Sequence, residues 1–216
     1  MEEQQQLLRA CKEGKFEEVK RIYKNQNINL NIKDENYPGS TPLIYACFHG
    51  HFEIVKLLLN DKRTNINLRN SNGSTGFSCS CGNGNVEIVK LMLRYEDLEV
   101  NKANNDGWTP LMVASFYGHL EIVQLVLGSG REVNLSVKNK WEKTATDLAR
   151  EKSTKEKEDW ETEEIFQKRV SNCSNIVKLL KAFENDSIEA RIQLRKQLGL
   201  SGKIFQVFLY FFITDW

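Results

Sequence analysis

The chain has 216 residues, enough for one ordinary domain or one elongated repeat array. Hydrophobic side chains make up 40% of it, so a core can be buried, and the modest glycine and proline content argues against a disordered chain. Its 30 basic and 29 acidic residues nearly balance, which argues against nucleic acid or an anionic lipid surface as the main partner.

The amino-terminal segment, MEEQQQLLRACKEGK, has neither the basic cluster nor the apolar stretch of a secretory signal. The chain contains five cysteines, an odd number without the spacing of a disulfide framework. Because disulfides persist mainly in oxidising compartments, we expect these cysteines to be reduced thiols. The expected location is therefore the cytoplasm, with the nucleus as the alternative.

A repeat dominates the centre of the chain. Three stretches align without gaps, each starting 34 residues after the one before: TPLIYACFHGHFEIVKLLL from Thr41, TGFSCSCGNGNVEIVKLML from Thr75 and TPLMVASFYGHLEIVQLVL from Thr109. Each is followed by a turn that ends in Ile-Asn or Val-Asn. A fixed period of this length indicates an array of similar structural units.

Each unit is expected to contain two short helices. The pairs Thr41-Pro42 and Thr109-Pro110 are typical of a helix start, since the hydroxyl caps the first turn and proline suits the first helical position. Glycines suited to a left-handed turn end these first helices at Gly50, Gly84 and Gly118. Acidic residues mark the start of the second helices near Glu53, Glu87 and Glu121. The second helix is apolar on more than one side, so units must stack to bury it.

These units strongly resemble the ankyrin-repeat family over about residues 5–186, through the recurring phrase TPL…A…GH.EIVKLLL. The resemblance implies an all-α ankyrin-repeat solenoid of about five helix-turn-helix units. We place these units near residues 5–36, 37–72, 73–106, 107–140 and 141–186. A C-terminal helix and an aromatic tail are expected over residues 187–216.

The sequence departs from the family pattern in two ways. The family usually has His after Thr-Pro-Leu, where this chain has Ile44, Ser78 and Met112, so a hydrogen-bonding device between neighbouring turns is missing. In the third unit Gly76 replaces the proline and Ser80 replaces the small alanine. We expect this unit to be the weakest link in the array.

The outer units match the pattern loosely. The N-terminal unit has a more polar second helix, as a capping unit should. In the last unit a first helix is expected from Thr144, but its partner helix, NIVKLLKAF, is expected only from Asn175. The charged insertion between them, residues 153–174, is interpreted as helical extensions around a solvated loop, with a dedicated docking element as the alternative.

The C-terminal tail is not repeat-like. Ile188, Ile192, Leu194 and Leu198 have rough helical spacing, so an extra helix is expected before the glycines at 199 and 202. The aromatic segment KIFQVFLYFFITDW follows, and its apolar run is too short to span a bilayer, which needs about 20 residues. It could pack on the last repeat, insert into a groove of a partner or lie at a membrane surface.

No catalytic or cofactor motif is present in the sequence, so we expect neither an enzyme nor a cofactor. His51 and His119 follow the unit glycines, where a structural role in the turn is expected. Cys79 and Cys81 are too few and too close for a zinc site, which needs four ligands. Because cysteine or serine recurs at one place in successive units, it is interpreted as a small residue where helices pack, and no metal site is expected.

The resemblance implies that partners bind the turn tips and the exposed side of the first helices. At those positions the second unit has Tyr45, Phe48 and His49, and the fourth has Trp108, Phe116 and Tyr117. Asn83 and Met112 complete the predicted partner-binding residues. Since exposed aromatic side chains often dominate interfaces, we expect a trough over the third unit between two aromatic surfaces. The alternative is that these rings pack on neighbouring turns.

The sequence therefore predicts a monomeric, non-catalytic adaptor or scaffold that binds a protein partner on the concave face. It predicts no nucleic-acid partner and no integral membrane segment. The alternative is a regulatory or targeting factor whose C-terminal tail docks to a partner complex or a membrane surface.

Overall fold

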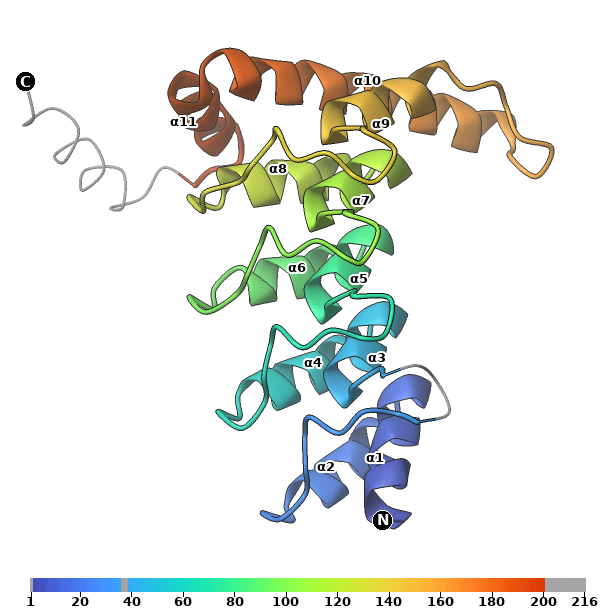
Figure 1. Ribbon diagram of the computed structural model, residues 1–216, viewed down its shortest axis with the longest axis vertical. Coiled ribbons are helices and arrows are strands. Elements are labelled where there is room, and N and C mark those ends of the chain that lie inside the picture. The colour runs from blue at the N-terminus through green and yellow to red at the C-terminus, as the bar shows by residue number, and fades with distance from the viewer. Residues whose placement is uncertain (1, 36–38, 201–216) are drawn as a thin grey trace, which may run out of the picture.

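The computed structural model describes residues 2–35 and 39–200, and eleven α-helices lie in these residues. Ten of them form five antiparallel pairs that stack into a column, and the eleventh follows at its C-terminal end (Figure 1). The helices are α1 (Glu2–Glu13), α2 (Phe16–Tyr23), α3 (Pro42–His49), α4 (Phe52–Leu59), α5 (Gly76–Gly82), α6 (Val86–Met92), α7 (Pro110–Tyr117), α8 (Leu120–Gly128), α9 (Ala145–Thr154), α10 (Glu163–Asn185) and α11 (Ser187–Gln197). The all-α solenoid predicted from the repeat is confirmed.

The first helices begin as their sequences predict. The Thr41 hydroxyl accepts a hydrogen bond from the Ile44 amide, and proline occupies the first helical position. In the third unit, where Gly76 replaces that proline, the start is held by a reciprocal pair of bonds: Thr75 Oγ1 accepts from the Ser78 amide and Ser78 Oγ accepts from the Thr75 amide. A capping box therefore fixes the helix start that proline favours elsewhere.

Asparagines at the ends of the second-helix turns join neighbouring units. Asn67 Nδ2 donates to the Asp97 carbonyl at 2.6 Å, while its Oδ1 accepts from the Glu99 amide at 2.9 Å. The same double bond pattern recurs from Asn31 to the second unit and from Asn101 to the fourth. Each asparagine thus satisfies one donor and one acceptor in the next turn, which is the kind of inter-unit bonding that the missing histidines would otherwise supply.

Arginines reinforce some of these junctions. Arg63 donates to the Gln26 carbonyl of the first unit at 2.7 Å, and Arg131 donates to the Glu96 carbonyl of the third unit at 2.8 Å. Arg63 and Arg131 follow Val55 and Val123 of their second helices at the same spacing. At this spacing from Val89, the third unit has Asp97, whose carboxylate cannot donate a hydrogen bond. The junction between the second and third units therefore lacks a bond that its neighbours have.

The last unit differs from the prediction. Its second helix does not start at Asn175 but twelve residues earlier, at Glu163, because Thr162 caps it and no glycine or proline interrupts the sequence before Asn185. The insertion at residues 153–174 consists, as interpreted from the sequence, of helical extensions around a loop: α9 runs to Thr154, α10 starts at Glu163, and residues 155–162 form the loop.

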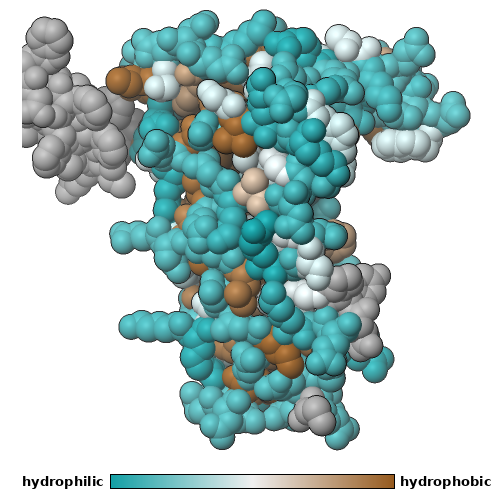
Figure 2. All heavy atoms as spheres, viewed as in Figure 1, coloured by the Kyte–Doolittle hydropathy of each residue, from teal (hydrophilic) through white to brown (hydrophobic). Residues whose placement is uncertain are grey.

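The C-terminal end of the column is closed by polar surface. The outer side of α10 is made of charged and polar residues, as suits a terminal unit. The predicted extra helix is present as α11, whose Leu194 is buried and whose Leu198 packs close to Gly128 of α8. Polar side chains cover most of the face seen in Figure 2, and apolar ones show mainly in patches along the middle of the column. The aromatic segment after residue 200 lies outside the described residues.

We expect Leu58→Ala to lower the free energy of unfolding by about 2–5 kcal/mol, because this fully buried leucine lies between stacked helices. Urea denaturation followed by circular dichroism measures the change. A loss well under 1 kcal/mol would contradict the packing described here.

Asp97→Arg is expected to raise the free energy of unfolding by about 1 kcal/mol. The new arginine would donate to carbonyls of the second unit, just as Arg63 and Arg131 donate to carbonyls of the unit that precedes each of them. Hydrogen exchange should slow in α4 and α6. Glu96→Arg changes the charge equally one residue away and serves as the control. If Asp97→Arg and Glu96→Arg change the free energy of unfolding equally, the missing hydrogen bond is not the cause of the change.

Candidate functional site

The exposed side of α3, α5, α7 and α9, together with the turns that precede them, forms one continuous surface, here called the first-helix face. Each of these turns is held by local hydrogen bonds: in the fourth unit Asn104 Oδ1 accepts from the amides of Asp106 and Trp108. The equivalent bonds in the fifth unit run to Asn139 Oδ1 from Trp141 and Lys143. One asparagine side chain therefore shapes each of these two turns by accepting two backbone amides.

Most of the predicted partner-binding residues lie at the surface of this face. Phe48 and Tyr117 expose 51% and 59% of their surface, values high enough for direct contact with a partner. His49 and Asn83 are also exposed, whereas Trp108 and Phe116 are half-buried. Partial burial lowers the pKa of His49, and the nearby His51 and Lys12 add to this effect, so the ring is biased towards its neutral form.

Two predicted residues are not available at the surface, and the expectation that they are exposed is wrong. Tyr45 is 5% exposed, and its hydroxyl donates to Asp34 Oδ2 at 2.7 Å, which ties the second unit to the turn before it. Met112 is 1% exposed, and its sulfur accepts a hydrogen bond from the Thr109 amide at the start of α7. Both side chains support the helix starts from beneath the face.

The aromatic residues of the fourth and fifth units form a connected group, here called the aromatic cluster: Trp108, Phe116, Tyr117 and Trp141. The Trp108 ring contacts Phe116 edge to face at 5.2 Å and Trp141 at 6.2 Å, measured between ring centroids. Phe116 contacts Tyr117 in the same geometry at 5.2 Å. Edge-to-face contacts hold the rings in place, so the exposed ones present a rigid surface.

Trp141 was not among the residues predicted from the sequence, although it is 53% exposed. Alignment by the threonines places Lys143, not Trp141, at the position of Trp108. The turns differ in detail: Trp141 takes the place of Asp106, and Glu142 has the left-handed conformation (φ 59°) that glycine adopts at Gly107. Its proximity to Trp108 depends on two turns meeting in space, and a repeat alignment carries no signal for that.

The third unit has small residues on this face, where its neighbours have aromatic ones. It carries Gly82 here, and a Cβ atom at this glycine would lie 2.8 Å from Val113 Cγ1, closer than side chains tolerate. Asn83 Nδ2 donates to the Phe48 carbonyl at 2.7 Å, so the amide bridges the second and third units. The small residue at this point lets the fourth unit pack closely against the third.

The residues after the unit glycines have a structural role, as predicted for the two histidines. His51 Nε2 donates to the Lys12 carbonyl at 3.1 Å, and His119 Nε2 donates to the Gly82 carbonyl at 2.9 Å. Asn85 Nδ2 does the same to the Cys47 carbonyl from the equivalent position in the third unit. Each side chain caps the C-terminal end of the first helix in the preceding unit, whose last carbonyls lack helical partners.

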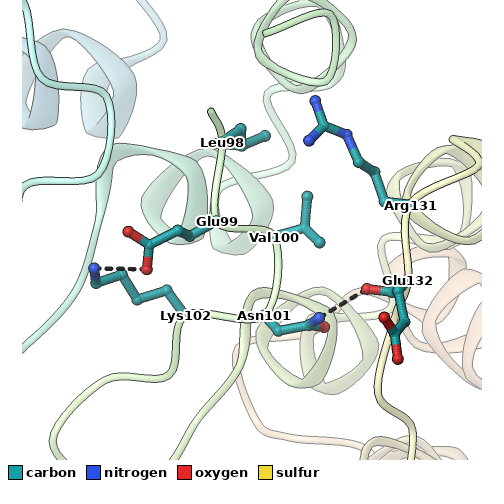
Figure 3. A pocket seen from close by; sticks show the side chains of 7 residues that line it. All are labelled: Leu98, Glu99, Val100, Asn101, Lys102, Arg131 and Glu132. Atoms are coloured by element: carbon teal, nitrogen blue, oxygen red, sulfur yellow. Dashed lines mark hydrogen bonds and ion pairs between the residues drawn. The ribbon is translucent and has the colours of Figure 1, made fainter. Parts of the chain in front are cut away.

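A depression between the turns after α6 and α8 is shown in Figure 3. Four of its polar side chains are bonded within the protein: Lys102 Nζ donates to Glu99, Asn101 Nδ2 donates to the Glu132 carbonyl, and Arg131 donates to carbonyls of the preceding turn. The site is built from groups that join the units, and it offers no arrangement of nucleophile and base.

The cysteines are buried or half-buried, and burial raises the pKa of the Cys79 thiol to about 11 and that of Cys47 still further. These thiols are therefore protonated and weakly nucleophilic at neutral pH. The described residues contain no group of three or more histidine, cysteine, aspartate or glutamate side chains placed to hold a metal ion. In residues 2–35 and 39–200 no helix is long and apolar enough to cross a membrane.

The loop 155–162 and the helix ends on either side of it form an arm that projects past the units below (Figure 1). Arg169 holds the arm together through two bonds to the Glu161 carboxylate, at 2.7 and 2.9 Å, and further bonds to the Lys152 and Glu156 carbonyls. This guanidinium lowers the pKa of Glu161 to about 2. Trp160, 73% exposed, lies in the loop beside this pair.

Comparison with known families agrees with this architecture. A family model described as ankyrin repeats in many copies matches residues 7–59, and a second, described as ankyrin repeats in three copies, matches residues 62–137. The chain therefore belongs to the ankyrin-repeat family. Ankyrin repeats generally mediate interactions between proteins, and their fold is an interaction module. A search of curated proteins finds no match to this chain.

We expect Glu161→Gln to loosen the arm, because the substitution removes the charge that pairs with the largely buried Arg169. Trypsin should then cleave after Lys155 and Lys157 severalfold faster than in the wild-type chain, as measured by mass spectrometry at neutral pH. Glu164→Gln, an exposed substitution in the next helix, is the control. Equal cleavage rates in all three proteins would contradict this role for the ion pair.

Proposed function

We propose that the protein is a non-catalytic adaptor or scaffold that binds a protein partner through its first-helix face, with the aromatic cluster as the main contact. In this proposal the protein acts as a monomer in the cytoplasm or nucleus, without cofactor or nucleic acid. The observation that supports it best is the group of rings held by mutual contacts, two of which, Tyr117 and Trp141, are more than half exposed.

Rigid exposed aromatic residues favour binding for a physical reason. A ring that is already fixed loses little conformational freedom when a partner covers it, so more of the buried area contributes to affinity. Tyr and Trp also combine a large apolar surface with a polar atom, which explains their frequency at the energetic centres of interfaces.

The third unit extends the proposed surface. Phe48 lies on one side of Asn83 and Tyr117 on the other, because Asn83 bonds the Phe48 carbonyl while Gly82 faces Val113 and Tyr117. We propose that an apolar side chain or a helix of the partner packs over the small residues of the third unit. With Tyr45 buried, Phe48 and His49 form the second-unit side of the trough.

The test compares proteins captured from a cell lysate by the immobilised wild-type chain and by a Tyr117→Ala, Trp141→Ala double variant, using quantitative mass spectrometry. We expect the main partner to lose at least about tenfold in affinity, since central aromatic residues commonly contribute 2 kcal/mol or more. Ile188→Ala, which removes a similarly exposed apolar side chain on α11, outside the first-helix face, is the control.

Retention of every partner by the double variant would contradict the proposal. A chain truncated after residue 200 tests the alternative that the C-terminal segment targets the protein to a partner complex or a membrane surface. A partner lost only on this truncation would move the binding function to residues 201–216 and leave the repeats as a platform.

A further inference from the structure

The turn of the fifth unit and α9 carry more positive than negative charge, and the acidic residues that balance it follow in residues 156–164. Residues 138–155, which form the turn of the fifth unit and α9, contain six Lys and Arg side chains but only three carboxylates. The chain as a whole is nearly neutral, so this excess is local. It lies beside the exposed rings, because Trp141 belongs to this segment and Lys152 sits over Phe116.

Five of these six cations are paired within the chain. Ion pairs join Lys138 to Glu142, Lys140 to Asp106, Lys143 to Glu151, Arg150 to Asp147 and Lys155 to Glu158. The three carboxylates of the segment, and Asp106 of the neighbouring turn, are all used in these pairs. The carboxylates of this segment are therefore already paired and are not available to a cationic partner.

Lys152 is the exception. Its ammonium lies 4.4 Å from the centroid of the Phe116 ring and forms no ion pair with any carboxylate in the described part of the chain. The nearest carboxylates on the arm, those of Glu158 and Glu161, are bound by Lys155 and Arg169. The side chain is half-buried, so its charge is only partly screened by water.

The lysines also occupy ring faces. Lys140 Nζ lies 4.5 Å from the centroid of Trp141, in addition to Lys152 over Phe116. A cation on a partner would compete with these two lysines for the same ring faces. An anion would instead be attracted to both ammonium groups while an adjacent apolar side chain covers the rings.

We propose that the aromatic cluster binds an acidic protein segment, in which a large apolar side chain packs on Tyr117 and Trp141 while a neighbouring Asp or Glu pairs with Lys152. This proposal rests on the proposed function and adds the chemistry of the partner. Charge complementarity of this kind raises the association rate and selects against basic segments. A purely structural Lys152, holding only Phe116, would not discriminate between acidic and basic segments.

The test begins with a random peptide library displayed on phage and selected on the immobilised full chain, with the Tyr117→Ala variant used to remove peptides that bind elsewhere. We expect the selected peptides to be enriched in Asp and Glu next to an aromatic or aliphatic residue. The affinity of the best peptide is then measured by fluorescence anisotropy for Lys152→Gln, Lys152→Glu and Lys152→Arg.

Lys152→Gln should weaken binding about three- to fivefold, the range of a partly exposed ion pair. Lys152→Glu should weaken it further, and Lys152→Arg should retain it. High salt should reduce the difference between the wild-type chain and Lys152→Gln. Lys178→Gln, on the outer side of α10, is the control and should have no effect.

Two outcomes separate the proposals. Peptides that require Tyr117 but lack acidic residues, or that bind equally well to Lys152→Gln, would overturn the acidic partner and leave the aromatic site intact. Failure of the library to yield any peptide that requires Tyr117 would overturn the proposed binding site itself, and the acidic partner with it.

Discussion

Stacking is the constraint on which the structure depends. The second helix of each central unit is apolar on more than one side, and a single pair of short helices has no way to cover it. The buried residues of α4, α6 and α8 therefore lie against neighbouring units, and the core is a continuous column. Stability in such a column is set by interfaces between nearest neighbours, so each junction matters separately.

The polar groups follow from the same constraint. Short helices and frequent turns leave many backbone carbonyls and amides without helical partners. Asparagine side chains at the turns, and histidine or asparagine after the unit glycines, satisfy these groups in the adjacent unit. The hydrogen bonds that complete one unit thus also fix its position on the next, and this makes the column rigid enough to present a defined surface.

In the proposed function, this rigidity serves the first-helix face. Tyr45 and Met112 lie beneath this face and hold the helix starts. Phe48, Tyr117 and Trp141 are more than half exposed on it. The aromatic cluster spans two units, so its shape depends on the junction between them. The fifth unit contributes twice, through Trp141 in its turn and through Lys152 on α9, and its arm is fixed separately by the pair of Arg169 and Glu161.

The repeat period, the capping threonines and the unit glycines were sufficient to predict the family and the helix pairs, because each of these depends on local sequence. Burial was predicted less well: the alignment placed Tyr45 and Met112 on the exposed side of the first helix, and both are buried. The early start of α10 follows from a cap at Thr162 that the alignment to a standard unit obscured. The contact of Trp108 with Trp141 and the unpaired charge of Lys152 were decided by the tertiary structure alone, since both depend on which side chains of two different units meet in space.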